Sequence, residues 1–205
     1  MTIKTIMFDL GGVVIDLDFS IFFNIIIAQS PLKTPKTQIM LEFFRQIGNY
    51  SKGKMSDDEF YQFACNLLQV CTLDKSKFFN AFNSIISGLD LEVIELIKEL
   101  RSKYRYKLIA LSNINYSHWN YVLNKNWDFI KVFDELILSH EIHLNKPDPK
   151  IFEYAIQKAG CEPEEIVFID DGLNNILSAQ VFGITGIKFT DIGELIEELK
   201  KIEVM

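Results

Sequence analysis

Five short apolar runs constrain the fold of this chain more than any other feature. They lie at residues 3–10, 107–111, 135–138, 165–169 and 186–189. Each run is almost continuously apolar instead of alternating, which is typical of parallel strands that are covered on both faces. Amphipathic helical patterns lie between them, at residues 91–104, 149–159 and 174–182. Strands that alternate with helices predict an α/β fold with a doubly wound parallel sheet.

Residues 17–88 interrupt this alternation. The segment contains several helical patterns and no convincing strand. Ser56 is followed three residues later by Glu59, a capping box that predicts a helix over residues 57–68. We therefore expect a catalytic core made of residues 1–16 and 89–205, with residues 17–88 inserted as a helical cap domain.

Charge and hydropathy argue against several classes of partner. The formal net charge is −7, and the one basic stretch, residues 101–107, is typical of a solvated helix end, so no nucleic-acid partner is expected. The longest apolar stretch, residues 19–28, is shorter than the ~20 residues that span a membrane. No secretory signal is visible, and we expect a cytoplasmic protein without a membrane partner. The oligomeric state stays open.

Several other residues receive ordinary interpretations. The three cysteines lack the spacing of metal ligands and are expected to be small buried apolar residues; they are Cys65, Cys71 and Cys161. The histidines also lack a metal-site spacing and are expected to pack or to lie at the surface; they are His118, His140 and His143. Phenylalanines in the inserted segment are expected to form the cap core; they are Phe19, Phe22, Phe23, Phe43 and Phe44.

Polar side chains follow four of the predicted strands, at the edge of the sheet where ligands bind in open parallel sheets. They are Asp9 after the first strand, Ser112 and Asn113 after the second, Lys146 beyond the third, and Asp170 and Asp171 after the fourth. A phosphoryl group in transfer spreads negative charge over its oxygens, so its catalysis depends on positioning and on nearby cations. The set offers both, because a carboxylate can form an aspartyl-phosphate and Lys146 supplies a positive charge.

The same residues allow a magnesium site. Mg²⁺ prefers carboxylates together with substrate oxygens. Asp9, Asp170 and Asp171 are the candidate carboxylate ligands, whereas Ser112, Asn113 and Lys146 are the candidate phosphate-binding residues. An alternative for Asp170 and Asp171 is that they cap the helix that follows Gly172.

The sequence around these positions resembles the haloacid dehalogenase (HAD) superfamily of hydrolases. The four matching motifs, in chain order, are residues 8–14 (Phe-Asp-Leu-Gly-Gly-Val-Val), 111–113 (Leu-Ser-Asn), 146–147 (Lys-Pro) and 168–171 (Phe-Ile-Asp-Asp). The resemblance covers nearly the whole chain. It implies a Rossmann-like core with a helical-bundle cap, Asp9 as nucleophile and a metal-supporting role for Asn175. The early cap and residues 16–19 (Asp-Leu-Asp-Phe) are most similar to the α-glucose-1-phosphatase branch.

Gly11 departs from the pattern of the family's phosphatases. Most of them carry a second Asp two residues after the nucleophile, which protonates the leaving group and later activates water. Gly11 has no side chain, although its carbonyl oxygen is still a candidate metal ligand. General acid–base catalysis is typically worth ~10²- to 10⁴-fold, so slow turnover is one expectation. Asp16 and Asp18 are the nearby candidates for a replacement acid.

We therefore expect a magnesium-dependent phosphatase that hydrolyses a small phosphorylated metabolite, such as a sugar phosphate, through an aspartyl-phosphate. A binding protein for a phosphometabolite or a protein partner, with vestigial catalysis, is the main alternative because of Gly11. A 2-haloacid dehalogenase ranks lower, since those enzymes need no metal and the Asp170–Asp171 pair favours one. A phosphomutase also ranks lower, because it too would normally need the missing acid.

Overall fold

The computed structural model of the protein describes residues 2–70 and 74–205. Its strands are β1 (Thr5–Phe8), β2 (Ile15–Leu17), β3 (Ile86–Leu89), β4 (Lys107–Ser112), β5 (Glu135–Leu138), β6 (Ile166–Asp170) and β7 (Thr185–Lys188). Its first helices are α1 (Ser20–Phe22), α2 (Lys36–Gln46), α3 (Gly48–Ser51), α4 (Asp57–Leu68) and α5 (Lys75–Asn83). The later helices are α6 (Leu91–Glu99), α7 (Tyr116–Asn124), α8 (Ser139–Ile142), α9 (Pro149–Ala159), α10 (Leu173–Gln180) and α11 (Ile192–Lys201).

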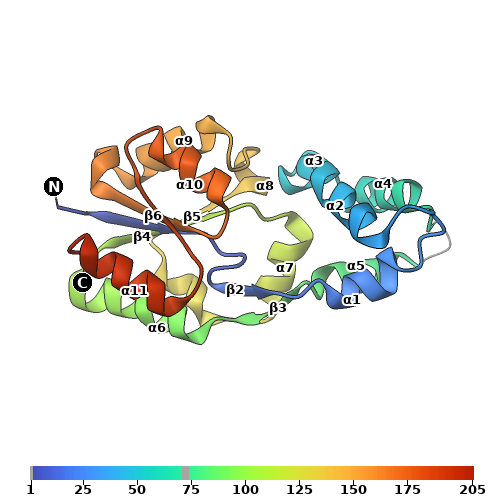
Figure 1. Ribbon diagram of the computed structural model, residues 1–205, viewed down its shortest axis with the longest axis horizontal. Coiled ribbons are helices and arrows are strands. Elements are labelled where there is room, and N and C mark those ends of the chain that lie inside the picture. The colour runs from blue at the N-terminus through green and yellow to red at the C-terminus, as the bar shows by residue number, and fades with distance from the viewer. Residues whose placement is uncertain (1, 71–73) are drawn as a thin grey trace.

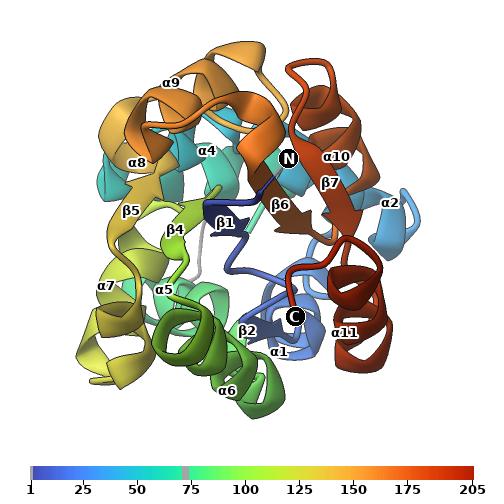
Figure 2. The same ribbon diagram turned by 90° about the vertical axis from the view of Figure 1, so that its left-hand side faces the viewer.

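Five parallel strands form the central sheet in the order β5-β4-β1-β6-β7 (Figure 2). These are the five strands that the apolar runs predict, and the doubly wound α/β fold is confirmed. β1 lies in the middle, and all four of its residues are buried. Of its two neighbours, β4 ends at Ser112 and β6 ends at Asp170, directly before Asp171.

Helices cover both faces of the sheet, which explains why the strands do not alternate in polarity. Figure 2 shows α9 and α10 on one face and α6 and α11 on the other. Met7 packs with Phe152 of α9 and Ile176 of α10. The next residue, Phe8, faces the opposite layer and belongs to the cluster that contains Val93 of α6 and Leu195 of α11.

The predicted helix boundaries in the core are largely confirmed. α9 begins at Pro149 after the N-cap Asp148 and ends at Gly160, whose φ of +70° favours glycine. The pattern over residues 91–104 forms α6 followed by a π-helical stretch, Leu100–Tyr104. Both local sequence signals therefore specify the structure that is observed.

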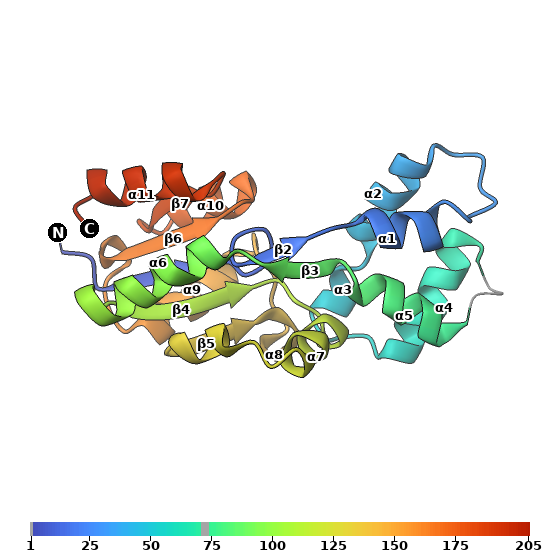
Figure 3. The ribbon, with the colours of Figure 1, turned by 90° about the horizontal axis from the view of Figure 1, so that it is seen from below.

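The helices α1 to α5 lie together at one end of the molecule, and both chain termini lie at the other end (Figures 1 and 3). They surround a separate apolar cluster in which Phe22, Phe43, Phe60 and Phe82 are fully buried. The predicted capping box is present, because the Ser56 side chain accepts from the backbone of Glu59 and Glu59 accepts from the backbone of Ser56.

A two-stranded antiparallel ribbon, β2 with β3, joins these helices to the core (Figure 3). The expectation of no strand within residues 17–88 is therefore wrong at both margins, since Leu17 ends β2 and β3 begins at Ile86. The two strands are short, and Asp16 and Gly88 weaken their apolar pattern, so the sequence signal is small. The division into a core (1–16, 89–205) and a cap (17–88) stays a prediction.

Two further expectations concern cysteines and membranes. Cys65 is buried, Cys161 is partly buried, and Cys71 lies outside the described residues. Within residues 2–70 and 74–205, the structure contains no helix with the length and apolar character that crossing a bilayer requires.

Candidate active site

The predicted site residues meet at the carboxyl ends of β1, β4 and β6. The three strands are adjacent and in parallel register, so Asp9, Ser112 and Asp170 are brought to one edge of the sheet. Asp9, Ser112, Lys146 and Asp170 are all buried polar side chains. Because buried polar groups require partners, their contacts define what each residue does.

Asp9 directly follows β1. Its Oδ1 atom accepts hydrogen bonds from the backbone N–H of Leu10 at 2.7 Å and from Lys146 Nζ at 2.8 Å. Burial raises the pKa of the Asp9 carboxyl to about 7, and the Asp170 charge acts in the same direction, while Lys146 opposes both. Without a bound cation, this carboxyl is therefore protonated far more readily near neutrality than an exposed aspartate.

Lys146 is the buried cation of the site. Its side chain is fully buried, and Nζ lies 2.8 Å from Asp9 Oδ1 and 2.6 Å from Asp170 Oδ2. The same ammonium group lies 5.4 Å from the centre of the Phe168 ring. A buried charge needs close opposite charges to offset its desolvation, and Lys146 has two. The geometry fixes its positive charge beside Asp9.

Asn113 holds the backbone of Lys146. The Lys146 N–H donates to Asn113 Oδ1, and Asn113 Nδ2 donates to the Lys146 carbonyl, both at 2.8 Å. This reciprocal pair ties the loop after β4 to the loop that carries Lys146. Substrate binding by Ser112 and Asn113 stays a prediction, but the side-chain amide of Asn113 already has a positioning role that the sequence did not suggest.

Asp170 is fully engaged by protein donors. Its Oδ1 atom accepts from the Gly172 N–H and from Asn175 Nδ2, each at 2.8 Å, and its Oδ2 atom accepts from Lys146. Asn175 thus supports the acidic cluster, as the family resemblance implies. Asp170 orients Lys146 in this structure, whereas its predicted role as a metal ligand stays a prediction.

The carboxylates of the site could hold a hard divalent cation. Asp9, Asp170 and Asp171 each offer an oxygen, and these three atoms lie within 4.8 Å of one another. Asp171 is partly exposed to solvent. Burial of part of its carboxyl group and the negative charge of Asp170 nevertheless raise the pKa of this carboxyl. A bound cation would favour the ionised forms of Asp9 and Asp171, whose pKa values are raised.

The turn after Asp9 contributes to the same site. Gly12 has a φ of +80°, and a Cβ atom there would lie 2.6 Å from Asp171 Oδ2. Only glycine therefore lets the Asp171 carboxylate approach this turn. The turn's own hydrogen bonds use the carbonyls of Leu10 and Ile15, and none of the described ones ends on the Gly11 carbonyl, the predicted metal ligand.

Gly11 itself is not strained. Its φ lies outside the left-handed region, and a Cβ atom there would meet Leu17 Cδ1 at 3.4 Å, an ordinary van der Waals contact. The space beside Gly11 is thus bordered by an apolar side chain from β2. The missing carboxylate could be accommodated at this position without a change of backbone conformation.

Neither proposed substitute for the missing acid faces this space. Along β2, Ile15 and Leu17 line the same pocket as Gly11. The intervening Asp16 faces the other side of the ribbon, beside Gly88. Asp18 is exposed and accepts from the Ser20 N–H at 2.8 Å, at the start of α1. The geometry does not support the expectation that either carboxylate replaces the missing acid.

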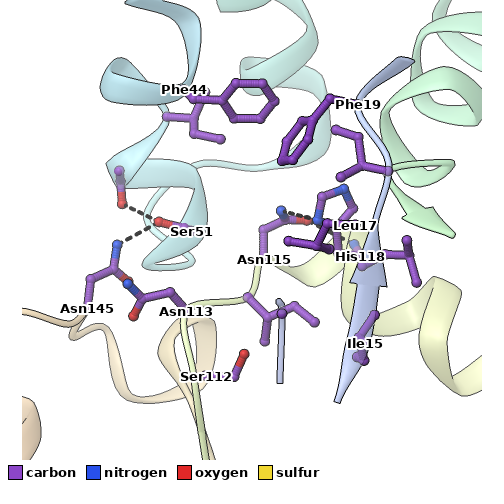
Figure 4. Close-up of a pocket in the computed structure, with 16 residues that line it drawn as sticks. Ile15, Leu17, Phe19, Phe44, Ser51, Ser112, Asn113, Asn115, His118 and Asn145 are labelled. Carbon is purple, nitrogen blue, oxygen red and sulfur yellow. Dashed lines mark hydrogen bonds between the residues drawn. The ribbon is translucent and has the colours of Figure 1, made fainter. Parts of the chain in front are cut away.

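A chamber of about 320 Å³ lies over Gly11 and Ser112, between the core and the helices of the inserted segment. Most of its wall is apolar, and this part consists of Ile15, Leu17, Phe19, Phe44, Ile47, Ile85, Ile86 and Ile114. Figure 4 shows Phe19 and Phe44 at the end of the chamber away from Ser112. Both had been expected only in the cap core; no local sequence signal distinguishes them from Phe22 and Phe43, which are buried there.

His118 lies against this chamber as a packed, neutral residue. Its ring stacks on Phe82 at 4.3 Å, and Nε2 lies 3.0 Å from the Phe82 carbonyl, to which it must donate. Nδ1 lies 3.2 Å from Asn115 Nδ2 and accepts from it. Burial lowers the pKa of His118 to about 4, so the expected packing role is confirmed.

Comparison with known proteins agrees with this geometry. The family model of haloacid dehalogenase-like hydrolases matches residues 3–183. The fold and the site together define a class of protein. Its members have a parallel α/β core that carries a buried aspartate, a buried lysine and an acidic pair at the strand ends. The chain belongs to the haloacid dehalogenase-like hydrolase family.

Several relatives are phosphatases. The chain is 29% identical over 181 residues to a D-ribitol-5-phosphate phosphatase of Bacteroides thetaiotaomicron, covering 85% of each chain. It is 26% identical over 205 residues to a sesquiterpene phosphatase of Aspergillus oryzae, covering 98% of this chain and 97% of the relative. A HAD family enzyme of Bacteroides thetaiotaomicron, solved with magnesium and inorganic phosphate, superimposes with a TM-score of 0.75 at 27% identity, covering 94% and 98% of the two chains.

Proposed function

We propose that this protein is a magnesium-dependent phosphatase that hydrolyses a small phosphorylated metabolite through an aspartyl-phosphate on Asp9. The observation that carries the proposal is the buried ion triad, in which Lys146 Nζ lies 2.8 Å from Asp9 and 2.6 Å from Asp170. A fixed positive charge beside a carboxylate lets that carboxylate meet an anionic phosphate.

Each step follows from the positions of these groups. Asp9 Oδ2, which none of the described hydrogen bonds uses, attacks phosphorus while Lys146 offsets the charge of the phosphoryl oxygens. The bond from phosphorus to the ester oxygen breaks, and its electron pair leaves with the organic group, which takes a proton from solvent to form the alcohol. Water then attacks phosphorus and releases a proton to solvent, and the bond from phosphorus to the Asp9 oxygen breaks, so that inorganic phosphate departs and the Asp9 carboxylate is restored.

Mg²⁺ would be held by Asp9, Asp171 and the Gly11 carbonyl. When bound, it neutralises part of the negative charge on the phosphate and the two carboxylates. Asp170, whose oxygens already accept from Lys146, Gly172 and Asn175, would instead keep Lys146 in place. Ser112, buried at the floor of the chamber beside Gly11, would bind a phosphate oxygen.

The comparisons support this proposal from outside the chain. Two of the relatives named above are phosphatases, and the structural neighbour was solved with magnesium and phosphate. Membership of the α-glucose-1-phosphatase branch and a cytoplasmic location remain parts of the proposal that rest on the sequence alone.

Gly11 favours one alternative, a phosphometabolite-binding protein whose catalysis is vestigial. Both possibilities predict phosphate binding, but only the enzyme predicts turnover. Solved dehalogenases that are 17–19% identical to the chain share its fold, with TM-scores of 0.62–0.65, and this likeness extends to the fold alone.

Substitution of Asp9 tests the proposal. Asp9→Asn keeps the size of the side chain but removes the anionic nucleophile, and we expect hydrolysis of p-nitrophenyl phosphate in Mg²⁺ to fall to background. Asp16→Asn is the matched control, because Asp16 faces away from the chamber, and its activity should equal that of the wild type. A folded Asp9→Asn protein that retains more than a few per cent of wild-type turnover would overturn the assignment.

A further inference from the structure

Two of the large apolar side chains in the chamber wall are more than a third exposed. Leu17 and Phe19 are 38% and 37% exposed, although both lie at the junction of the cap and the core. The Phe19 ring packs edge-on against Phe44 at 5.2 Å, and the two rings form the far wall (Figure 4). Exposed apolar surface gathered around one cavity marks a place where a ligand buries apolar area.

Three polar side chains of the chamber wall, those of Asn113, Asn115 and His118, already form hydrogen bonds within the protein. His118 pairs with the Phe82 carbonyl and with Asn115, and Asn115 Oδ1 also accepts the N–H of His118. Asn113 pairs through both amide atoms with the backbone of Lys146. These bonds fix the orientation of the three side chains in the chamber wall and use part of their hydrogen-bonding capacity.

Two further polar side chains of the chamber wall, Ser51 and Asn145, bond to each other where the cap meets the core. Ser51 Oγ donates to the Gly48 carbonyl at 3.1 Å and accepts from Asn145 Nδ2 at 2.6 Å. Asn145 Oδ1 is, within residues 2–70 and 74–205, the one buried side-chain nitrogen or oxygen without a hydrogen-bond partner. Most of the chamber wall is apolar, and most of its polar side chains already bond to the protein, so the several hydroxyl groups of a polyol would find few partners.

The chamber also lacks charge. Among the described residues that line it, His118 is the only ionisable side chain, and it is neutral and fully paired. A second phosphate, a carboxylate or an ammonium group on the ligand would find no opposite charge. The organic part of the ligand must therefore be uncharged.

We infer that the substrate is the phosphomonoester of a compact, apolar alcohol, whose hydrocarbon group fills the space bounded by Leu17, Phe19 and Phe44. This inference rests on the proposed function, because it places the phosphate at Asp9 and Ser112. The chamber volume of about 320 Å³ is at the lower end of the range for ligand pockets, ~300–1,000 Å³, so the group is small. Sugar and polyol phosphates are disfavoured because burying an unpaired hydroxyl is costly.

A matched pair of esters tests the inference. Pentyl phosphate and D-ribitol 5-phosphate are both primary alkyl phosphates on the same carbon chain, so they differ in hydroxyl groups and not in leaving-group type. We expect kcat/KM to be about 100-fold or more higher for pentyl phosphate, since a single added hydroxyl is rejected by up to ~100-fold in an apolar site. Equal values, or a preference for the ribitol ester, would overturn the inference.

Variants locate the preference in the chamber. Leu17→Asn places an amide beside Gly11 and should reduce the pentyl-to-ribitol ratio by about tenfold, the effect of removing one or two methylene-sized contacts. Phe19→Gln tests the opposite wall if Leu17→Asn is unstable. Leu41→Asn is the control: Leu41 is 68% exposed on α2 and does not line the chamber, so its ratio should equal that of the wild type. A change in the control as large as that in the wall variants would contradict the assignment.

Binding measurements separate this inference from the proposed function. Calorimetry with pentylphosphonate and with the phosphonate analogue of ribitol phosphate requires no turnover. Tighter binding of pentylphosphonate that Leu17→Asn weakens would support the chamber assignment even if no ester is hydrolysed, in which case the proposed phosphatase activity alone fails. Hydrolysis that depends on Asp9 but shows no preference would leave the phosphatase proposal standing and overturn the substrate class.

Discussion

The two halves of the site are built on opposite principles. At the strand ends, Asp9, Lys146 and Asp170 form a dense polar network in which nearly every atom is paired. In the chamber above, Leu17, Phe19 and Phe44 present apolar surface, and polar residues such as Asn113 and Asn115 also bond to neighbouring protein groups. The first half fixes charges for one reaction, whereas the second offers shape and burial. We therefore expect substitutions in the network to affect every substrate and those in the chamber to affect only some.

Lys146→Ala should produce the largest loss that tests this comparison. Removing the ammonium group leaves Asp9 and Asp170 buried without their shared cation, and we expect kcat to fall by ~10²- to 10³-fold for all esters. Lys146→Arg should lose less, because the charge persists, but the guanidinium cannot occupy the same compact space. Steady-state kinetics on pentyl and p-nitrophenyl phosphate provide the measurement.

The control for this variant is Lys150→Ala, an exposed residue near the start of α9. It should match the wild type in activity and melting temperature. Loss of activity in Lys146→Ala toward one ester only would break the distinction between a general network and a selective chamber. Equal activity of Lys146→Ala, Lys146→Arg and wild type would mean that Lys146 has no part in the reaction.

Asn113→Ala should reduce kcat less than Lys146→Ala does, because it only misplaces the Lys146 ammonium group. The variant removes both hydrogen bonds to the Lys146 backbone, and we expect kcat to fall by about tenfold while KM changes little, because misplacing a catalytic charge slows chemistry. Asn113→Asp keeps the acceptor for the Lys146 N–H and should lie between Ala and wild type. Asn124→Ala, an exposed residue on α7, is the control. A rise in KM alone would instead indicate that Asn113 contacts substrate.

The same contrast determines what the sequence could and could not predict. Asp9, Ser112, Lys146 and Asp170 were predictable because each follows a buried strand or its loop, and parallel strands bring their ends together. The role of Asn113 was not, since a reciprocal bond across 33 residues leaves no local pattern. The sequence could therefore predict which of these residues lie together but not how they contact one another.

The chamber could not be predicted from the sequence for a different reason. Phe19 and Phe44 differ from Phe22 and Phe43 only in how the cap lies on the core, which depends on long-range contacts such as that of Ser51 with Asn145. The ribbon β2–β3 was also missed, although it turns Leu17 toward Gly11 and Asp16 away from it. Apolar residues carry a burial signal but no information on which surface they cover.

Magnesium binding should depend on pH because the pKa of Asp9, one of the proposed ligands, is raised toward neutrality. The pKa of Asp9 is raised to about 7 from 3.8, so the folded protein binds more protons than the unfolded chain between about pH 4 and 7. Its stability therefore falls as pH rises through that window, and Mg²⁺, which binds the ionised form, offsets the loss above it. Apparent Mg²⁺ affinity should be about tenfold weaker at pH 6 than at pH 8.

Thermal unfolding with and without Mg²⁺ measures this dependence. The rise in melting temperature caused by Mg²⁺ should be larger at pH 8 than at pH 6, and Asp9→Asn should remove most of the difference. The chamber variant Leu17→Asn should retain it, since the Leu17 side chain supplies no oxygen to the cation and leaves the Asp9 carboxyl unchanged. An equal rise at both pH values in the wild type would contradict the raised pKa of Asp9.

Gly11→Asp addresses the boundary between the two halves, and its expected effect is confined to one class of ester. Gly11 has an unstrained backbone, and a Cβ atom there meets Leu17 at 3.4 Å, so the new carboxylate should fit without unfolding the turn. It would supply the acid that the network lacks, beside the apolar group that the chamber holds. General acid catalysis is worth up to ~10²- to 10⁴-fold when optimally placed, but here a carboxylate would stand beside Leu17 instead of in a polar pocket.

We expect a gain of about tenfold on pentyl phosphate and little on p-nitrophenyl phosphate, whose leaving oxygen hardly needs a proton. Comparing both esters in wild type and variant separates acid catalysis from a general change in binding, which would move the two together. A wild type that already hydrolyses pentyl phosphate briskly, with no improvement in Gly11→Asp, would show that the apolar ester departs without an acid from this position, and that Gly11 belongs to the chamber instead of being a damaged part of the network.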